Sequence, residues 1–217
     1  LAALRHRDMV SGQGQHIDLA LFDAQVAALS HLAMIYLVTG QQPARLGTAS
    51  PITCPYQAFE CADAPIMIAV GNDSQFVKLC ECLGLPELAA DSRFKTNPDR
   101  AKHRLVLVPL LAEVLKTRRV AQWYADFDAA GVPSGPINNF AEVFADPQIV
   151  HREMLLHMPH PTVGESPPGA NPVRFSASPI QYQRPPPLLG EHTSEVLREV
   201  LQMDEQGISE LRQRKVI

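Results

Sequence analysis

The spacing of hydrophobic residues predicts strands and helices that alternate along the chain. From His16 to Leu21 polar and apolar residues alternate, which is typical of a strand whose charged member, Asp18, faces away from the core. From Phe22 to Val38 the chain is rich in Ala, Leu, Met and Ile, which predicts a long and mostly buried helix. Thr39-Gly40 then provides a glycine stop for that helix.

A second group of elements follows an irregular stretch at 41–55. Residues 56–61 and 65–71 read as two strands joined by a turn, and Ile66, Ile68 and Val70 share one face of the second strand. Helices are expected at 74–83, 86–90, 99–116 with an interruption at Pro109, 120–130, 140–145, 147–153, 193–202 and from 204 to about 214, with short strands at 154–158 and 173–176. This interleaving of strands and helices predicts an α/β or α+β fold class.

Composition and charge exclude several classes of protein. The chain has 217 residues, of which 46% are hydrophobic and 19% charged, so it is long and apolar enough to form a core. The net charge is −4 and no Lys/Arg cluster stands out, which argues against binding of nucleic acid. No apolar run reaches the roughly 18 residues of a membrane span, and no signal peptide is visible, so we expect no membrane partner and a cytoplasmic location.

Few short sequence motifs point to a catalytic or metal-binding site. None of the metalloprotease, nucleophile-elbow, phosphate-loop or dinucleotide-binding motifs is present. Cys80 and Cys82 form a C-x-C pair, but the chain has no second such pair and no histidine nearby. We therefore expect reduced thiols and no metal site. The histidines at 151, 157 and 160 are better explained as a solvated rim than as metal ligands.

Two turns have both a structural and a functional interpretation. Glu191-His192-Thr193 is typical of a helix cap, with a His–carboxylate pair at a cleft edge as the alternative. Residues 70–76 read as a strand-to-helix turn capped by Ser74, with an anion held by the N–H groups as the alternative. The loop at 41–55 is longer than most connections in compact domains, and such loops are often functional.

Seven motifs in order carry a resemblance that covers the whole chain. Together they resemble the family III CoA-transferases: SGQGQHIDLALFDAQVA (11–27), PYQAF (55–59), IAVGNDSQF (68–76), RFKTNPDR (93–100), GVPSGPINN (131–139), EVFADPQ (142–148) and PPPLLGEHT (185–193). The sequences of 45–59 and 185–193 are most similar to the subgroup that uses dicarboxylic acids, such as the succinate–hydroxymethylglutarate CoA-transferases.

The resemblance implies a reaction and an architecture. Family members have a large Rossmann-like domain that binds CoA and a small domain inserted in the chain, and two chains interlock as a homodimer. An Asp carboxylate attacks the acyl-CoA thioester, and the acyl and CoA groups exchange through an aspartyl-CoA thioester. Acyl-CoA and a carboxylic acid are therefore the expected substrates. No metal or redox cofactor is implied, and coenzyme A enters as a substrate.

Aligned on these motifs, the chain resembles the C-terminal half of a family member. Residues 1–40 and 150–217 are expected in the large domain, 41–59 in a linker and substrate loop, and 60–140 in the small α+β domain. The catalytic Asp is expected upstream of Leu1, because Asp18 and Asp23 match strand and helix positions and not the nucleophile. No catalytic residue is therefore expected within the chain itself.

The acceptor side of the site is assigned to five residues of the loop: Arg45, Gly47, Thr48, Tyr56 and Gln57. Glycine allows close approach of the backbone, the Thr and Gln side chains donate to a carboxylate, and Tyr offers an apolar face with a polar tip. The arginine is the expected partner of a second carboxylate. The alternative is a structural turn with Tyr56 in the small-domain core.

Two other functions stay open on the sequence. The α-methylacyl-CoA racemases share the fold, and they often carry a Glu just before the pair that corresponds to Gln75-Phe76, where this chain has Asp73 two positions earlier. A dimerisation and substrate-lid module without chemistry of its own is the second alternative. The loop also departs from formyl-CoA transferase, since Ser50 to Thr53 contains no glycine where that enzyme has a flexible glycine run.

Overall fold

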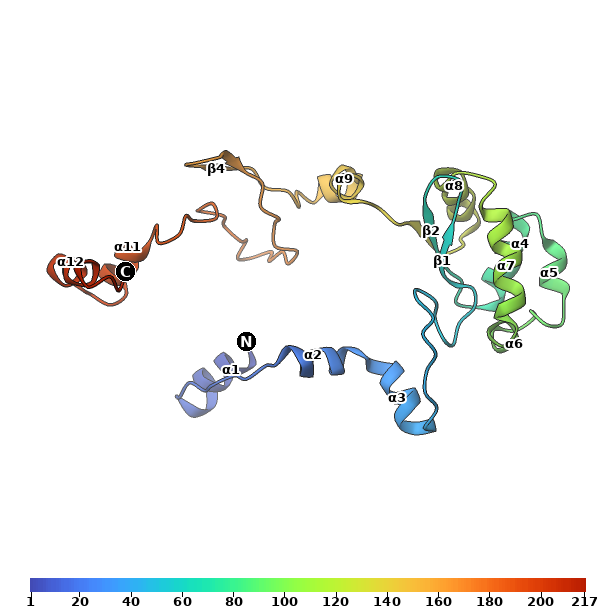
Figure 1. Cartoon of the computed structure of the whole chain (residues 1–217), viewed down its shortest axis with the longest axis horizontal. Helices are drawn as coiled ribbons and strands as arrows, with labels where there is room; N and C mark the ends of the chain where they lie inside the picture. Colours follow the sequence, from blue (N-terminus) through green and yellow to red (C-terminus); the bar gives the residue numbers. More distant parts are fainter. The chain divides into compact units, whose positions relative to one another are not determined.

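Two units make up the computed structural model, which describes residues 1–217: residues 1–137 and residues 138–217, each treated by itself below (Figure 1). Both mix helices with short antiparallel strands, which confirms the α/β class in its broad sense. The sheet and the large hydrophobic core both belong to the first unit.

The N-terminal segment of the first unit is helical and exposed. α1 (Ala2–His6) continues into the π-helical turn η1 (Arg7–Ser11), and α2 (Leu21–Ala28) and α3 (Ser30–Thr39) follow. Gly40 ends α3 with φ of 69°, a left-handed conformation that glycine adopts without strain, so the glycine stop is confirmed.

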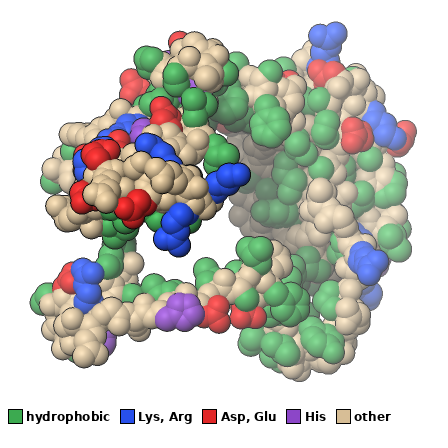
Figure 2. All heavy atoms as spheres, turned by 60° about the vertical axis from the view of Figure 1, so that its left-hand side comes forward, with side chains coloured by type: hydrophobic (Ala, Val, Ile, Leu, Met, Phe, Trp, Pro, Cys, Tyr) green, Lys and Arg blue, Asp and Glu red, His purple; other side chains and the backbone are tan.

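Other expectations for this segment are wrong. No strand forms at 16–21, where no second strand offers its backbone for pairing. The single helix expected at 22–38 is broken at Leu29, between α2 and α3, and the next residue, Ser30, has φ of 48°. No residue of α2 or α3 is buried, so their apolar side chains are uncovered within these 217 residues. Hydrophobic side chains are widespread on the surface seen in Figure 2.

None of the helices, taken singly, has the length and hydrophobicity that a membrane span requires. α2 and α3 pass that test of length and composition only as a pair, and they are bent by 74° at their junction.

A three-stranded antiparallel sheet forms the centre of the first unit. β1 (Tyr56–Glu60) pairs with β2 (Pro65–Ala69), and β2 pairs with β3 (Ser134–Pro136), so the strand order is β1-β2-β3. Ile66, Ile68 and Val70 are all fully buried, which confirms the shared face expected from their alternation.

Helices cover that sheet and complete one hydrophobic cluster between Cys54 and Val132. They are α4 (Asp73–Cys82), α5 (Pro86–Ala90), α6 (Asn97–Lys102), α7 (Arg104–Leu115) and α8 (Val120–Ala130). α7 buries Leu107, Leu111 and Leu115, which recur every four residues on one helix face. Trp123 and Phe127 of α8 stack with ring centroids 5.6 Å apart.

The break in the long helix expected at 99–116 is displaced. It falls at His103, between α6 and α7, while Pro109 lies inside α7. Both Pro109 and Leu105, four residues before it, are exposed, so the carbonyl that loses its donor lies on the side facing water.

The second unit consists of short elements with few buried side chains. Its helices are α9 (Phe140–Ala145), α10 (Pro147–His151), α11 (Thr193–Glu199) and α12 (Glu205–Gln213), and its hairpin pairs β4 (Met158–His160) with β5 (Gly164–Ser166). Asn139 and Glu142 form a capping box that begins α9, and the Asp146 side chain caps α10. The strand expected at 154–158 is displaced to β4, and none forms at 173–176.

Candidate functional site

The loop that precedes β1 folds back onto the start of that strand. The Thr48 hydroxyl oxygen accepts from the Ala58 N–H at 3.1 Å, and the Ser50 N–H donates to the Tyr56 carbonyl at 2.9 Å. Gly47 has φ of 61°, and its turn is closed by a bond from the Ala49 N–H to the Leu46 carbonyl. The loop and the first residues of β1 therefore form one connected surface.

The structure places four of the five predicted site residues in this segment, although Tyr56 and Gln57 are successive strand residues whose side chains point to opposite faces of the sheet. Gly47 and Thr48 lie in the turn, and Tyr56 and Gln57 open β1. Tyr56 is 40% exposed, so its ring is not part of the core. The Thr48 hydroxyl accepts its backbone bond through the oxygen, which leaves its proton free to donate. Arg45 is exposed, precedes the turn and forms no ion pair.

A set of polar side chains from α6 and α7 holds the backbone of residues 51–54. Asn97 donates from Nδ2 to the Ile52 carbonyl at 2.8 Å and accepts on Oδ1 from the Cys54 N–H at 3.1 Å. Arg104 donates to the Pro51 carbonyl at 3.2 Å, and Arg100 donates from Nε to the Cys54 carbonyl at 2.8 Å. Sequence reasoning missed these contacts, although the RFKTNPDR motif at 93–100 contains two of the residues.

Arg100 is the one buried charged residue of the first unit. Its Nη1 donates to the Phe94 carbonyl at 3.0 Å, and the guanidinium lies 4.5 Å from the centre of the Phe76 ring. Its Nη2 lies 2.8 Å from Asp73 Oδ1, so the buried positive charge is paired with a carboxylate that is itself half exposed. The motif at 68–76 therefore supplies the ring and the carboxylate that accompany this arginine.

The turn between β2 and α4 is structural. The cap of α4 is Asn72 and not Ser74, because the Asn72 side chain accepts from the Gln75 N–H at 2.9 Å. The Gly71 N–H donates to the Gln75 side chain at 2.8 Å. Since both of these N–H groups have internal partners, the structure favours the plain turn over an anion site.

Burial raises the pKa of the Cys54 thiol, and the positive charges of Arg104 and Arg100 offset part of that rise. Its side chain is 1% exposed and its carbonyl is bound by Arg100. Cys54 is therefore a packing residue of the loop and not a nucleophile at neutral pH.

The other candidate clusters do not assemble. No group of three His, Cys, Asp or Glu residues is arranged to hold a metal ion. His157 instead contacts Glu165 at 2.5 Å, and His160 contacts the Pro186 carbonyl at 3.1 Å. The Glu191 carboxylate accepts from the Leu188 N–H at 2.9 Å, in the turn before α11. The helix cap expected at 191–193 is wrong, because α11 begins after His192 without a side-chain cap bond, and His192 lies 3.4 Å from the Glu195 carboxylate.

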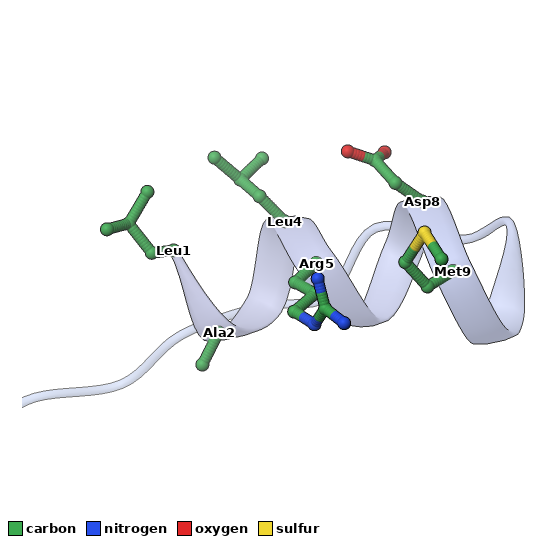
Figure 3. A pocket seen from close by; sticks show the side chains of 6 residues that line it. All are labelled: Leu1, Ala2, Leu4, Arg5, Asp8 and Met9. Atoms are coloured by element: carbon green, nitrogen blue, oxygen red, sulfur yellow. The ribbon is translucent and has the colours of Figure 1, made fainter.

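A surface hollow of about 560 Å³ lies along the first nine residues. Figure 3 shows that all of its lining side chains, including Leu4 and Met9, come from a single helical stretch. None of these residues is buried. Because one element alone forms its wall, the hollow has no facing group with which to enclose a substrate.

Comparison with known proteins agrees with the sequence motifs. The family model described as CoA-transferase family III matches residues 1–193. The chain is 43% identical over 201 residues to the succinyl-CoA:glutarate CoA-transferase of Homo sapiens, covering 93% of this chain and 46% of that protein. It is 40% identical over 200 residues to the succinate–glutarate CoA-transferase of Agrobacterium fabrum, covering 92% of this chain and 50% of that protein.

The chain is also similar to a solved structure. A CAIB/BAIF family protein from Brucella suis is 41% identical with a TM-score of 0.72, and the match covers 91% of this chain and 50% of that chain. The chain thus spans about half the length of the curated relatives it matches.

Proposed function

Because this chain belongs to CoA-transferase family III, we propose that the whole protein transfers coenzyme A between carboxylic acids and accepts a dicarboxylic acid. The observation that carries the acceptor side is the loop surface, where the Thr48 hydroxyl binds the backbone of β1 at Ala58, next to Gln57 in the sequence. Relatives at about 40% identity are named for succinate and glutarate, which supports a dicarboxylic acceptor.

We further propose that the nucleophile is an Asp outside residues 1–217. Attack of its carboxylate on the acyl-CoA thioester, followed by return of the CoA thiolate, gives an aspartyl-CoA thioester and releases the donor acid. The acceptor carboxylate then takes over the CoA by the reverse steps. Negative charge develops on the carbonyl oxygen in each step and needs preorganised donors beside the nucleophile. Within residues 1–217, the proposed acceptor-binding residues are Arg45, Gly47, Thr48, Tyr56 and Gln57.

The proposed domain layout follows from the same resemblance. Residues 60–140 form the small domain, which is supported by the sheet and the hydrophobic cluster between Cys54 and Val132. Residues 1–40 and 150–217 belong to the large domain, joined by the linker and loop at 41–59. The uncovered apolar side chains of α2 and α3 support this layout, because such surfaces need cover from the rest of the protein or from a second chain of a homodimer.

The proposal is tested with the full-length protein, using succinyl-CoA as donor and glutarate as acceptor. In Gln57→Ala we expect the KM for glutarate to rise about tenfold, because a hydrogen bond to a charged group contributes about 1.5–3 kcal/mol. The KM for the acyl-CoA should stay unchanged. Gln122→Ala is the control, because it is the same substitution at the start of α8, where the Gln122 side chain accepts from the Arg119 N–H at 3.1 Å.

Two results would count against these assignments. Absence of CoA transfer by the wild-type protein rejects the activity itself. An unchanged glutarate KM in Gln57→Ala rejects the role of Gln57 while leaving the activity in place.

Arg45 is proposed to bind the second carboxylate of the acceptor. In Arg45→Leu we expect kcat/KM for glutarate to fall at least tenfold, while that for a monocarboxylate such as butyrate stays within twofold, because only the dicarboxylate loses a charged partner. Arg119→Leu is the control. Arg119 is exposed, and the carbonyl of its neighbour Arg118 accepts from the Ala62 N–H. This bond places Arg119 beside the turn at the far end of β1. Equal losses for both acceptors would refute the assignment.

A further inference from the structure

We propose that Asn97 and Arg100 are positioning residues that hold residues 51–55 in place and thereby set the geometry of the acceptor surface. Neither residue is placed in contact with substrate. The inference rests on the proposed function, since it assumes that the loop surface receives the acceptor. Its basis is a set of contacts between segments more than forty residues apart in sequence.

Asn97 binds the loop backbone on both sides of Thr53. Its amide donates to the carbonyl of Ile52 and accepts from the N–H of Cys54, so both polar groups of the side chain are used by the loop backbone. A side chain with only an acceptor or only a donor satisfies one of these groups and leaves the other without its partner. The residue thus recognises the backbone of 52–54 in one conformation.

Arg100 binds the backbone carbonyl of Cys54. Its Nε donates to the Cys54 carbonyl at 2.8 Å, while its remaining groups bind the Phe94 carbonyl and Asp73. Because the guanidinium is planar and lies over the Phe76 ring, its position is set by the core and not by the loop. The rigid core therefore determines where Cys54 lies.

The constraint reaches the acceptor surface through the backbone. The residue after Cys54 is Pro55, whose carbonyl accepts from the Val70 N–H at 3.1 Å, and Tyr56 and Gln57 follow directly. At the other end, the Ser50 N–H is bound to the Tyr56 carbonyl at 2.9 Å. Loss of the contacts at 52–54 releases the loop between these two bonds. The turn that carries Thr48 is then held to β1 by the Thr48–Ala58 and Ser50–Tyr56 bonds alone, so its position relative to Gln57 is less constrained.

The test uses the full-length protein with two readouts, hydrogen–deuterium exchange of peptides that cover 50–57 and steady-state kinetics with succinyl-CoA and glutarate. In Asn97→Ala we expect exchange in this segment to accelerate about tenfold and the glutarate KM to rise about three- to tenfold. The KM for succinyl-CoA and kcat should stay within twofold. Asn97→Asp keeps the acceptor for the Cys54 N–H and should give an intermediate effect.

Arg100→Lys provides the second variant. It retains the positive charge near Asp73 but loses the fork that binds two carbonyls, so the same changes are expected. Arg118→Lys is its matched control, because Arg118 also pairs with an aspartate, at 2.8 Å from Asp126, and lies over an aromatic ring. Gln122→Ala serves as the control for Asn97→Ala.

The outcomes separate this inference from the proposed function. Faster loop exchange with a raised glutarate KM supports it. Faster exchange with an unchanged glutarate KM overturns it and leaves CoA transfer intact, as does unchanged exchange in both variants. If the wild-type protein transfers no CoA, the proposed function fails, and the inference about the acceptor fails with it even where the exchange data show that the loop is held.

Discussion

Residues 1–217 produced on their own should transfer no CoA above background. The proposed nucleophile lies outside them, and the polar groups of the loop surface bind an acceptor without supplying a carboxylate that attacks a thioester. Asp73, the acid that lies against Arg100, is occupied by the ion pair with that residue. Removing a covalent nucleophile eliminates the pathway itself, so the expected effect is complete loss of turnover and not a change in KM.

The measurement is release of free glutaryl-CoA from succinyl-CoA and glutarate, followed by chromatography, with the full-length protein as positive control. Far-ultraviolet circular dichroism and native Trp123 fluorescence show whether the core of the first unit is folded in the shorter chain, because Trp123 is the only tryptophan and is 2% exposed. Turnover by residues 1–217 well above background would refute the proposal that the nucleophile lies elsewhere.

The part of the fold that could be predicted from the sequence is the part whose side chains are sorted by local burial. Ile66, Ile68 and Val70 alternate because one face of β2 is covered by helices, and the alternation alone identifies that face. The same pattern at 16–21 is misleading, because a strand forms only when another strand supplies hydrogen bonds, and none does so here. Alternation therefore indicates a strand only where its partner is also in the chain.

The candidate site divides in a similar way. The loop residues are accessible to sequence reasoning because glycine, proline and polar side chains cluster in one stretch around Gly47. The contacts that hold the loop are not accessible, since Asn97 lies 45 residues from Ile52 and nothing local specifies that pairing. The one available signal is the placement of Asn97 and Arg100 three residues apart, which sets them on the same side of a helix. Without the structure, nothing indicates which segment of the chain these two residues contact.

Arg100→Ala should have the largest effect on stability of any single substitution considered, lowering the free energy of unfolding by about 3–5 kcal/mol. The wild-type side chain is fully buried, so truncation leaves a cavity beside the Phe76 ring and leaves the carbonyls of Phe94 and Cys54 without their donor. The loss of the ion pair itself contributes less, because Asp73 is 55% exposed and regains water.

Urea unfolding of residues 1–217, followed by Trp123 fluorescence, measures this change in the core of the first unit, and a loss of this size corresponds to a midpoint lower by about 2 M. Arg93→Ala is the control, because Arg93 pairs with Asp91 at 2.6 Å on the surface, where water and salt screen the pair and its contribution to stability is small. If Arg100→Ala and Arg93→Ala lower stability equally, the buried guanidinium does not organise the core around residues 51–55. The loop would then owe its conformation to its bonds with β1, from the Thr48 hydroxyl and the Ser50 N–H, and not to α6.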